Sequence, residues 1–596
     1  MRRAMMALRS LLGSLSRKAE VREEAEAPRL GDIVHEWVSA LSQDGSGRVV
    51  VLSGQDDDEH ARLIAEALPN ASVTAIAFGA AGTGAHADVG EYPRVDAVYA
   101  ADAESAWIRV IAGVEPVVIL HGGGIDPELE IAIFKALYPT LRNGGSYLLE
   151  GTILDSSRPA TNSRSVGDYL KRIIAIRELS DGAARRAIPL EDRALGDAIE
   201  DVRAFGDNVA IVKRFTHAIK LSEEIAEEVI LGRIGSARVR TIKEIPPQSI
   251  TSRTVVSSNR PALSRRFPSV LHVPKLLLRE YDRVVCAPRQ VSMVDWLVLP
   301  TSFHQPWYRP LRTRGLVDAG PRFTRIKPEM RKPPRLAGAF FHLDNEWAGH
   351  YGHFITQDLS KLWGWQDALA LHPDLKILIS AHDGAPDLHG FQIEMLAALG
   401  IDAERIHVIT APVVVDHLIT ATQAFQNPRF ISPTMSDLWR DMSVRLARGT
   451  ESDVVPDRVF AARGGEFKRA CRNARDVEKL FEDHGFTIIY PESMSIAEQV
   501  STFSRAHVIA GYTGSALLNL IFSSTPGVRI LIGSESYTSV NEYLISALQG
   551  DEFHYFWCEP DIHHPDGGRS GKAFHSDFEF DFDRDGPALV SLLESI

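Results

Sequence analysis

Two loops in the C-terminal quarter of the chain carry the side chains best suited to chemistry. The first loop follows the segment RVFAAR (458–463) and is basic; its cations are Arg463, Lys468, Arg469 and Arg472. The second loop lies in GYTGSALLNLIF (511–522) and is rich in glycine; its backbone and hydroxyl donors come from Thr513, Gly514 and Ser515. Fixed cations, hydroxyl groups and the free N–H groups that begin a helix all stabilise anions. Together the two loops predict a pocket for a nucleotide diphosphate.

Alternating strands and helices must bring these loops together. Residues 458–523 read as strand, basic loop, helix, strand, helix, strand, glycine-rich loop and helix. In a parallel α/β sheet, the loops at the carboxyl ends of the strands face one crevice. Glu492 ends one of these strands and could accept hydrogen bonds from ribose or sugar hydroxyls, or instead cap a helix or form a salt bridge. Glu498 and Gln499 lie within a helix, where we expect them to orient the glycine-rich loop.

A second candidate site lies upstream, where GHYGHFITQDLSKLWGW (349–365) leads from a loop into a predicted helix. A transfer of a group onto a hydroxyl oxygen needs a general base to take the hydroxyl proton, and an unperturbed histidine titrates near neutral pH. His353 and Asp358 are the candidates for this base. On one regular helix, five positions separate them by more than about 100°, so they need not act on the same atom.

The two segments, taken in order, resemble glycosyltransferase family 61. The C-terminal match comprises Arg463 with the basic loop, Pro491-Glu492, Ser495, Glu498-Gln499 and Gly511-x-x-Gly514-Ser515-x-Leu517-x-Asn519. The upstream match comprises Gly349-His350-Tyr351-Gly352-His353-Phe354-Ile355 with Leu362-Trp363. The resemblance covers roughly the second half of the chain. It implies a GT-B enzyme that inverts the configuration of a sugar taken from a nucleotide donor, commonly a UDP-sugar, and it adds Asn519 to the donor-binding residues.

One departure from the family pattern leaves an alternative open. Many members have a histidine before the second glycine of the glycine-rich loop, whereas this chain has Thr513. If that histidine contacts the donor, its role is lost or has moved here. A non-catalytic scaffold built from degenerate enzyme folds is therefore the rival hypothesis.

The segment from residue 28 to residue 215 also alternates short apolar strands with helices, and it resembles a class I methyltransferase. A methyl-donor site needs a glycine-rich turn after the first strand, but the turn here is Ser53-Gly54-Gln55-Asp56-Asp57-Asp58. The second strand ends at Ala77-Phe78-Gly79 without an acid for the ribose hydroxyls. Because a fold alone does not establish an activity, we expect a degenerate domain that supports the transferase or docks partners. A bifunctional methyltransferase–glycosyltransferase is the alternative.

The predicted fold class is α/β: a Rossmann-like, methyltransferase-type domain followed by a GT-B transferase of two Rossmann-like halves. Residues 216–335, rich in proline and basic side chains, read as a strand-containing connection. The expected divisions are an amphipathic and linker N-terminus (1–27), the methyltransferase-like domain (28–215), the connecting region (216–335), the acceptor-side half (336–456) and the nucleotide-sugar-binding half (457–596).

Composition limits the classes of partner. The chain has 596 residues and a formal net charge of −13, which argues against a general nucleic-acid binder. Its three cysteines fit a reducing compartment rather than a disulfide scaffold. No apolar run approaches the ~20 residues needed to span a bilayer. Residues 1–18 form a basic amphipathic pattern that fits an anionic membrane surface, a helix packed on the protein itself or a frayed start. A cytoplasmic protein is therefore expected, with peripheral contact at the inner face of the membrane as one alternative.

The sequence predicts no required metal or other cofactor. Asp581-x-Asp583 lies in HSDFEFDFDRD, which alternates acids and aromatics and reads as an edge strand. His342, Asp344, His350 and His353 match no standard zinc spacing. The predicted activity is therefore a metal-independent transfer of a sugar, from a UDP-sugar to a glycan or lipid-linked saccharide acceptor, in bacterial capsular polysaccharide biosynthesis.

Overall fold

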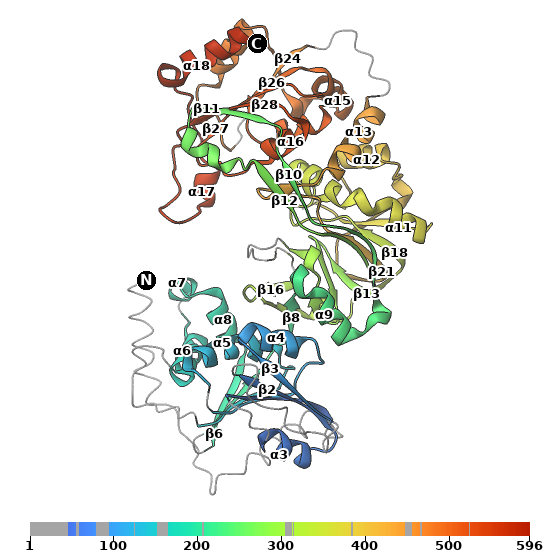
Figure 1. The fold of residues 1–596 in the computed structure, drawn as a ribbon, viewed down its shortest axis with the longest axis vertical. Coiled ribbons are helices and arrows are strands. Elements are labelled where there is room, and N and C mark those ends of the chain that lie inside the picture. The colour runs from blue at the N-terminus through green and yellow to red at the C-terminus, as the bar shows by residue number, and fades with distance from the viewer. Residues whose placement is uncertain are drawn as a thin grey trace. The chain divides into compact units, whose positions relative to one another are not determined.

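The computed structural model divides the chain into two compact units (Figure 1). The first unit contains the described residues up to Val239, together with 283–287 and 291–334; the second contains 240–282, 288–290 and 335–596. The segment expected to connect the domains, 216–335, is thus shared between both units. The structure describes residues 46–54, 59–78, 94–123, 125–151, 165–180, 182–205, 208–303, 311, 313, 315–382, 386–447, 456–464, 468–523 and 525–596. The amphipathic N-terminus and the acidic turn Asp56–Asp58 lie outside these residues.

A seven-stranded sheet forms the centre of the first unit, with the order β3-β2-β1-β4-β5-β7-β6. The first five of these strands run parallel, and β7 runs antiparallel to both β5 and β6. Helices cover the sheet, so its central strands are continuous buried apolar runs, as parallel strands must be. The predicted Rossmann-like α/β sheet is confirmed. Its strands are β1 (Gly47–Ser53), β2 (Ala71–Phe78), β3 (Val95–Ala100), β4 (Val118–His121), β5 (Ser146–Leu149), β6 (Ile199–Phe205) and β7 (Asn208–Lys213).

The helices of the first unit begin with ordinary capping signals. Asp102 and Asp126 each accept hydrogen bonds from backbone N–H groups of the first turn of the helix that follows. A smaller set of five strands in mixed orientation adds to this unit, one before α9 and four after it. The helices are α3 (Glu59–Ala67), α4 (Ala103–Ile111), α5 (Pro127–Leu137), α6 (Val166–Glu178), α7 (Gly182–Arg186), α8 (Leu190–Asp197) and α9 (Glu223–Ile234), and the added strands are β8 (His217–Lys220), β14 (Val291–Val294), β15 (Leu297–Val298), β16 (Leu316–Asp318) and β17 (Phe323–Ile326).

The second unit contains two parallel sheets. In the earlier one, β18 runs parallel to β19 and β21, and β19 runs parallel to β20; β13 lies beside β21. Its strands are β13 (Leu276–Ala287, in this unit as far as Asp282), β18 (Arg335–His342), β19 (Lys376–Ser380), β20 (Ile406–Ile409) and β21 (Val413–Ala421). The helical segments are α10 (Tyr351–His353), the π-helix η7 (Phe354–Asp358), the 3-10 helix η8 (Leu359–Gly364), α11 (Trp365–Leu371), α12 (Gly390–Ala398) and α13 (Thr434–Leu446).

The later sheet of the second unit has six parallel strands in the order β11-β28-β27-β26-β24-β25. Two parallel sheets in one unit are compatible with the GT-B arrangement that the sequence predicts. The strands are β11 (Val255–Ser258), β24 (Arg458–Ala461), β25 (Thr487–Ile489), β26 (Val508–Tyr512), β27 (Val528–Ser534) and β28 (Glu552–Cys558). The helical segments are α14 (Ala474–Asp483), α15 (Ile496–Arg505), the 3-10 helix η11 (Ser515–Phe522), α16 (Asn541–Gln549), α17 (Gly571–Phe574) and α18 (Phe582–Ser595).

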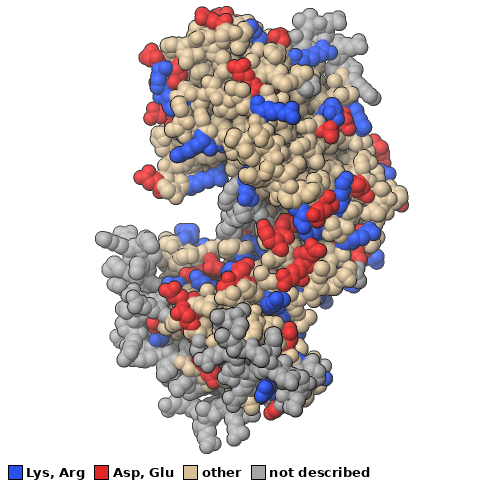
Figure 2. All heavy atoms as spheres, viewed as in Figure 1, with Lys and Arg blue, Asp and Glu red and all other residues tan. Residues whose placement is uncertain are grey.

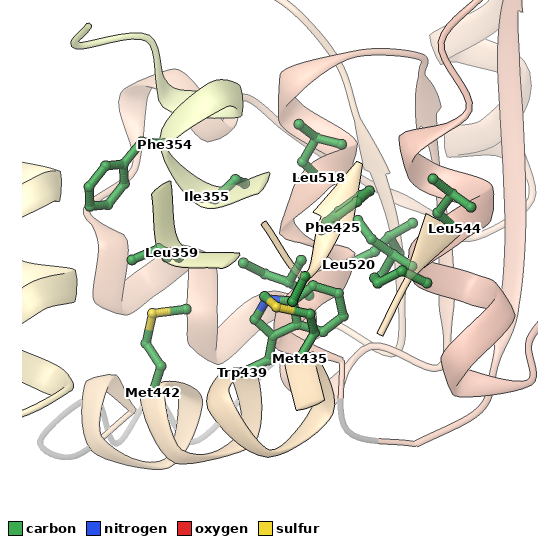
Figure 3. Packing of buried hydrophobic residues seen from close by; sticks show 14 of the residues in the cluster. Phe354, Ile355, Leu359, Phe425, Met435, Trp439, Met442, Leu518, Leu520 and Leu544 are labelled. Atoms are coloured by element: carbon green, nitrogen blue, oxygen red, sulfur yellow. The ribbon is translucent and has the colours of Figure 1, made fainter. Parts of the chain in front are cut away.

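One hydrophobic core joins the two sheets of the second unit (Figure 3). Phe354 and Leu359 come from the helical segments after β18, Trp439 from α13, and Leu518 and Leu544 from the segments around the later sheet. All five are at most 3% exposed. The halves therefore fold against each other and hold the loops at their strand ends in fixed positions.

Three segments differ in detail from the expectations drawn from sequence. HSDFEFDFDRD does not form an edge strand, because its alternating aromatics enter the core while Phe578 makes only isolated bridges with Cys471 and Pro560. The helix after the glycine-rich loop is a 3-10 helix, and the helix after the Gly-His segment is an irregular α, π and 3-10 run. Within Asp581-x-Asp583, Asp581 caps α18.

Charge is mixed over the described surface: Figure 2 shows Lys and Arg interspersed with Asp and Glu on the face it presents. None of the helices in the described part of the chain combines the length and apolar character that crossing a bilayer requires.

Candidate functional site

The basic loop and the glycine-rich loop meet at the carboxyl ends of β24 and β26, which are neighbouring parallel strands. Arg463 follows β24 and donates a hydrogen bond to the carbonyl oxygen of Thr513. Gly514 lies beneath two guanidinium groups: a Cβ atom added to it would lie 2.4 Å from Nη2 of Arg463 and 3.2 Å from Nη2 of Arg469. Two of the predicted donor cations thus converge on the predicted glycine.

The convergence of two like charges marks this place as a site for an anion. Burial and the neighbouring Arg469 lower the pKa of Arg463 to about 10, so the group stays charged at neutral pH. Arg469 has a φ of 63°, an uncommon backbone conformation for a residue other than glycine. Its guanidinium carbon lies 4.5 Å from the ring centroid of Tyr537 and 5.6 Å from that of Phe574, which holds it by cation–π contact.

Carboxylate side chains accept hydrogen bonds from backbone N–H groups of both loops. The Gly514 N–H donates to Oε1 of the buried Glu542 at 2.8 Å. The Gly464 N–H donates to Oε1 of Glu492 at 2.5 Å, so this acid fastens the basic loop. Burial raises the pKa of Glu542, although the Gly514 N–H and the two arginines oppose that shift. The positive charge available to a ligand therefore comes from guanidinium groups rather than from backbone.

The other predicted donor residues lie in different surroundings. Lys468 is exposed on the basic loop, whereas Arg472 forms an ion pair with Asp561 at the surface. Thr513 is 3% exposed, and a Cβ on Gly533 would lie 2.4 Å from its hydroxyl oxygen. The Thr513 side chain is therefore buried under the loop, and only its carbonyl oxygen meets Arg463.

A chain of hydrogen bonds connects the two sequence motifs. The hydroxyl of Tyr351 donates to Oδ1 of Asn519, and Nδ2 of Asn519 donates to Oε1 of Gln499 at 2.7 Å. Asn519 is fully buried, so it positions the loop instead of touching a donor. A Cβ on Gly352 would lie 3.0 Å from Oγ of Ser515 and from Leu518, which shows how closely the Gly-His segment approaches the glycine-rich loop.

His350 lies on the side of the site that faces Arg469. Its Nδ1 accepts a hydrogen bond from the His353 N–H at 3.4 Å and so caps α10. Accepting at Nδ1 assigns the proton of the neutral ring to Nε2. Partial burial and Arg469 lower the pKa of His350, which favours this neutral form. The ring can therefore donate one hydrogen bond from Nε2 without adding charge.

His353 is held in position by a relay that ends at Asp358. Its ring stacks on Trp347 with centroids 5.4 Å apart, and the Trp347 N–H donates to Oδ1 of Asn345 at 2.6 Å. Nδ2 of Asn345 in turn donates to Asp358 at 2.5 Å. Asp358 is 1% exposed, so it lies beneath the site while His353 is partly exposed above it. The regular helix assumed for these two residues is replaced here by the π-helix η7.

A buried polar group at the ends of β18 and β19 supports this relay. Burial raises the pKa of Asp358 to about 7, opposed by Lys361, whose own pKa burial lowers. Lys361 donates to the carbonyl oxygen of Asp344, and the Asp344 carboxylate accepts from Ser380 and from the Gln290 N–H. These contacts join residues that lie far apart in the sequence without a common spacing, so no sequence signal pointed to Lys361. The same holds for Glu542, which binds the Gly514 N–H.

The histidines of this region do not form a metal group with Asp344. Burial lowers the pKa of His342 to about 3, and the ring is 2% exposed beside Lys361, a cation. Within the described residues, metal-ligand spacing is found in one group only, and that group contains none of His342, His350 or His353.

The comparison with protein families agrees with the resemblance to glycosyltransferase family 61. The family model of glycosyltransferase 61 matches residues 351–531, which include His353, Arg463 and the glycine-rich loop. This match supports glycosyltransferase activity for that part of the chain. A comparison with curated proteins found no match.

Solved structures similar to the chain are methyltransferases. The MycE methyltransferase from the mycinamycin biosynthetic pathway, in complex with Mg, SAH and mycinamycin VI, has 14% identity and a TM-score of 0.24, and the match covers 35% of this chain and 54% of that one. An O-methyltransferase family protein from Burkholderia thailandensis has 11% identity, coverage of 35% and 60%, and a TM-score of 0.21. A putative caffeoyl-CoA O-methyltransferase from Staphylococcus aureus has 10% identity, coverage of 35% and 91%, and a TM-score of 0.21. The chain spans about half the length of MycE.

Proposed function

We propose, from the match of residues 351–531 to glycosyltransferase 61, that this chain transfers a sugar from a nucleotide diphosphate donor to a hydroxyl group of a glycan. The observation that carries the proposal is the convergence of Arg463 and Arg469 on Gly514. Two guanidinium groups at one strand end repel each other, and an anionic ligand removes that repulsion. A diphosphate presents the charge and the oxygen geometry that guanidinium groups bind in bidentate fashion.

The same cations serve the leaving group. In the reaction, the acceptor oxygen bonds to the anomeric carbon of the sugar, and the bond from that carbon to the diphosphate oxygen breaks. Negative charge builds on the departing diphosphate, and pre-positioned cations stabilise that charge in the transition state. Arg463 and Arg469 supply this stabilisation, and the Nε2–H of His350 adds a neutral donor. Ser515, at the close approach to Gly352, can donate from its hydroxyl.

His353 is the general base of this proposal. It takes the proton that the acceptor hydroxyl loses as the new bond forms, and the sugar configuration inverts. Its partly exposed ring is oriented by Trp347, whereas Asp358 is enclosed and acts through Asn345. Asp358 is thus a positioning residue for His353 rather than a second base.

The donor that fits the resemblance is a UDP-sugar, and the acceptor is a glycan or a lipid-linked saccharide of a bacterial capsule or related polysaccharide. The methyltransferase-like first unit supports this enzyme without a methyl-transfer reaction of its own. Residues 1–18 supply peripheral contact with the inner face of the membrane.

Calorimetric titration of the intact protein with UDP tests the proposal. Wild type should bind UDP, and Arg463→Gln should bind it at least tenfold more weakly, because a hydrogen bond to a charged group contributes about 1.5–3 kcal/mol. Arg475→Gln, which removes an exposed cation from α14, is the matched control and should bind as wild type does. If wild type binds no nucleoside diphosphate, the transferase proposal fails and the degenerate scaffold remains.

A further inference from the structure

A compact group of two carboxylates and two histidines lies in the earlier sheet of the second unit. Glu280 and Asp282 are two positions apart on β13, so both side chains leave the same face of the strand. His417 lies on the neighbouring strand β21, and His372 directly follows α11. None of these residues belongs to the donor site or to the relay beneath His353.

The ligand atoms of this group already face one another. Nδ1 of His417 lies 2.8 Å from Oδ1 of Asp282 and 3.3 Å from Oε1 of Glu280. Nε2 of His372 lies 2.9 Å from the same Oε1. One atom from each of Glu280, Asp282 and His417 falls within 4.8 Å of the others. Three donor atoms on two neighbouring strands therefore face one another, and His372 reaches the group through its contact with Glu280.

Zinc binds nitrogen and oxygen ligands at about 2.0–2.2 Å, which separates tetrahedral neighbours by about 3.3 Å. The three contacts of 2.8, 2.9 and 3.3 Å lie within about 0.5 Å of that spacing. We propose that Glu280, Asp282 and His417 bind one divalent transition-metal ion of the zinc class, and that His372 turns from Glu280 to complete the coordination of that ion. Imidazole ligands favour zinc, copper or nickel over magnesium and calcium, which prefer oxygen alone.

The surroundings of Glu280 prepare it for this role. Arg240 binds its Oε2 and leaves Oε1 directed at the two histidines. An outer partner of this kind orients a metal-binding carboxylate.

An ion at this place ties β13 to β21 and to the end of α11. Glu280 is 7% exposed, whereas the Asp282 and His417 side chains are 36% and 42% exposed. The group thus has a buried base and an open outer side through which an ion can enter. Its role is a structural cross-link, because it closes three chain segments around one ligand.

Metal binding to the full-length protein tests this inference. The protein is first stripped with a chelator, then titrated with Zn²⁺ in competition with a chromophoric chelator, and in parallel with Co²⁺ followed by its visible absorption. Wild type should bind one ion per chain at this site, gain thermal stability, and show the intense bands of four-coordinate Co²⁺. His417→Gln and Asp282→Asn should each weaken binding at least tenfold and remove those bands. His407→Gln, on strand β20 of the same sheet, is the matched control and should bind as wild type does.

Two results would overturn the inference. One is the absence of any bound ion in wild type, which would leave four side chains joined by histidine–carboxylate pairs. The other is binding that persists in both ligand variants but disappears in His389→Gln, which would move the ion to the stacked pair His382 and His389. Circular dichroism of each variant shows whether it is folded. If His417→Gln does not fold, Asp282→Asn still tests the inference, because it changes a partly exposed side chain at constant shape.

Discussion

Loops follow the carboxyl ends of central parallel strands both in the seven-stranded sheet of the first unit and in the later sheet of the second unit. The side chains around these loops differ between the two sheets. At the ends of β1 and β4, backbone groups bond to each other: the Gly122 N–H donates to the Leu52 carbonyl at 2.8 Å and the Gly54 N–H to the Gly123 carbonyl at 3.4 Å. Among the described residues near these ends, Oε2 of Glu150 lies 3.4 Å from Nε2 of His60. At the ends of β24 and β26, two guanidinium groups converge instead.

The difference shows that the same type of sheet provides a strand-end binding position in both units, and that the charge of the surrounding side chains determines what can bind there. A methyl donor and a nucleotide sugar both need a strand-end crevice; among the described residues, two guanidinium groups that converge on a strand-end glycine are found at the second sheet. Four changes, matched between the two units, test whether this contrast governs function.

The largest effect is expected from the general base. His353→Gln should lower kcat by about 10²- to 10⁴-fold, the usual contribution of a positioned base, while the Kd for UDP stays unchanged. His121→Gln, which removes a buried histidine from the first unit, should leave kcat unaltered. A steady-state assay of UDP release with calorimetric Kd values measures both. Equal losses in the two variants would mean that unfolding, not proton transfer, explains the result.

The next effect concerns glycines at the two strand ends. Gly514 has a φ of 136° and a ψ of −160°, a region essentially restricted to glycine, and a Cβ there would strike Arg463. Gly514→Ala should cost roughly 1–3 kcal/mol of stability and weaken UDP binding more than tenfold. Gly123→Ala places its methyl group where no atom lies within 4 Å and should change neither property. Thermal unfolding and UDP titration report the outcome, and wild-type binding by Gly514→Ala would contradict the proposed cradle.

Buried histidines should make both units sensitive to acid. Burial lowers the pKa of His121 to about 4 and that of His342 to about 3, from an ordinary value of 6.5. Below pH 6.5 the unfolded chain binds a proton that the folded chain does not, so stability falls as the pH drops toward those values. At pH 5 each histidine should cost about 2 kcal/mol relative to pH 8. Urea unfolding at both pH values should show less acid sensitivity in His121→Gln and in His342→Gln; unchanged sensitivity would exclude a neutral buried ring.

The smallest effect should follow loss of a single tyrosine hydroxyl. Tyr351→Phe leaves Oδ1 of Asn519 without this donor, and Tyr147→Phe removes the hydroxyl that lies 2.9 Å from Nδ1 of His121 in the first unit. Each should cost about 1 kcal/mol of unfolding free energy. Only Tyr351→Phe should also weaken UDP binding, by a few-fold, because it alone connects to the glycine-rich loop. Equal UDP affinities in the two variants would show that the motif-to-motif link is purely structural.

Sequence reasoning found the elements because their signals are local. Apolar runs such as those of β1 and β27 are buried parallel strands, and the loops after β24 and β26 do meet. Arg463 and Gly514 were placed together correctly because neighbouring parallel strands end at the same edge. Ser515 and His353 were identified from motifs, and their chemical roles stay predictions.

The remaining contacts depend on distant residues that no local pattern joins. Asn519 and Thr513 lie within a donor-like motif, yet the structure buries both, because the motif also has to join the core. Arg472 lies in a basic loop, but Asp561 neutralises it from far along the chain. The Gly514 N–H of the glycine-rich loop is taken by Glu542, whose position in α16 is fixed only by the fold. Asp358 is five residues from His353, but Asp358 is buried whereas His353 is partly exposed, so the two side chains lie in different surroundings.

The edge strand β11 is synthesised long before β28, the strand with which it pairs. Val255 pairs with Glu552, and the Asn259 side chain both accepts from the Trp557 N–H at 2.7 Å and donates to the Trp557 carbonyl at 3.0 Å, across 298 residues of chain. At translation rates of about 5–20 residues per second, β11 leaves the ribosome roughly 15–60 s before its partner strand exists. During that interval its edge is open to chaperones or to other chains. A ribosome that stops short of residue 552 therefore releases a chain that lacks β28 and in which β11 has no partner strand in the later sheet.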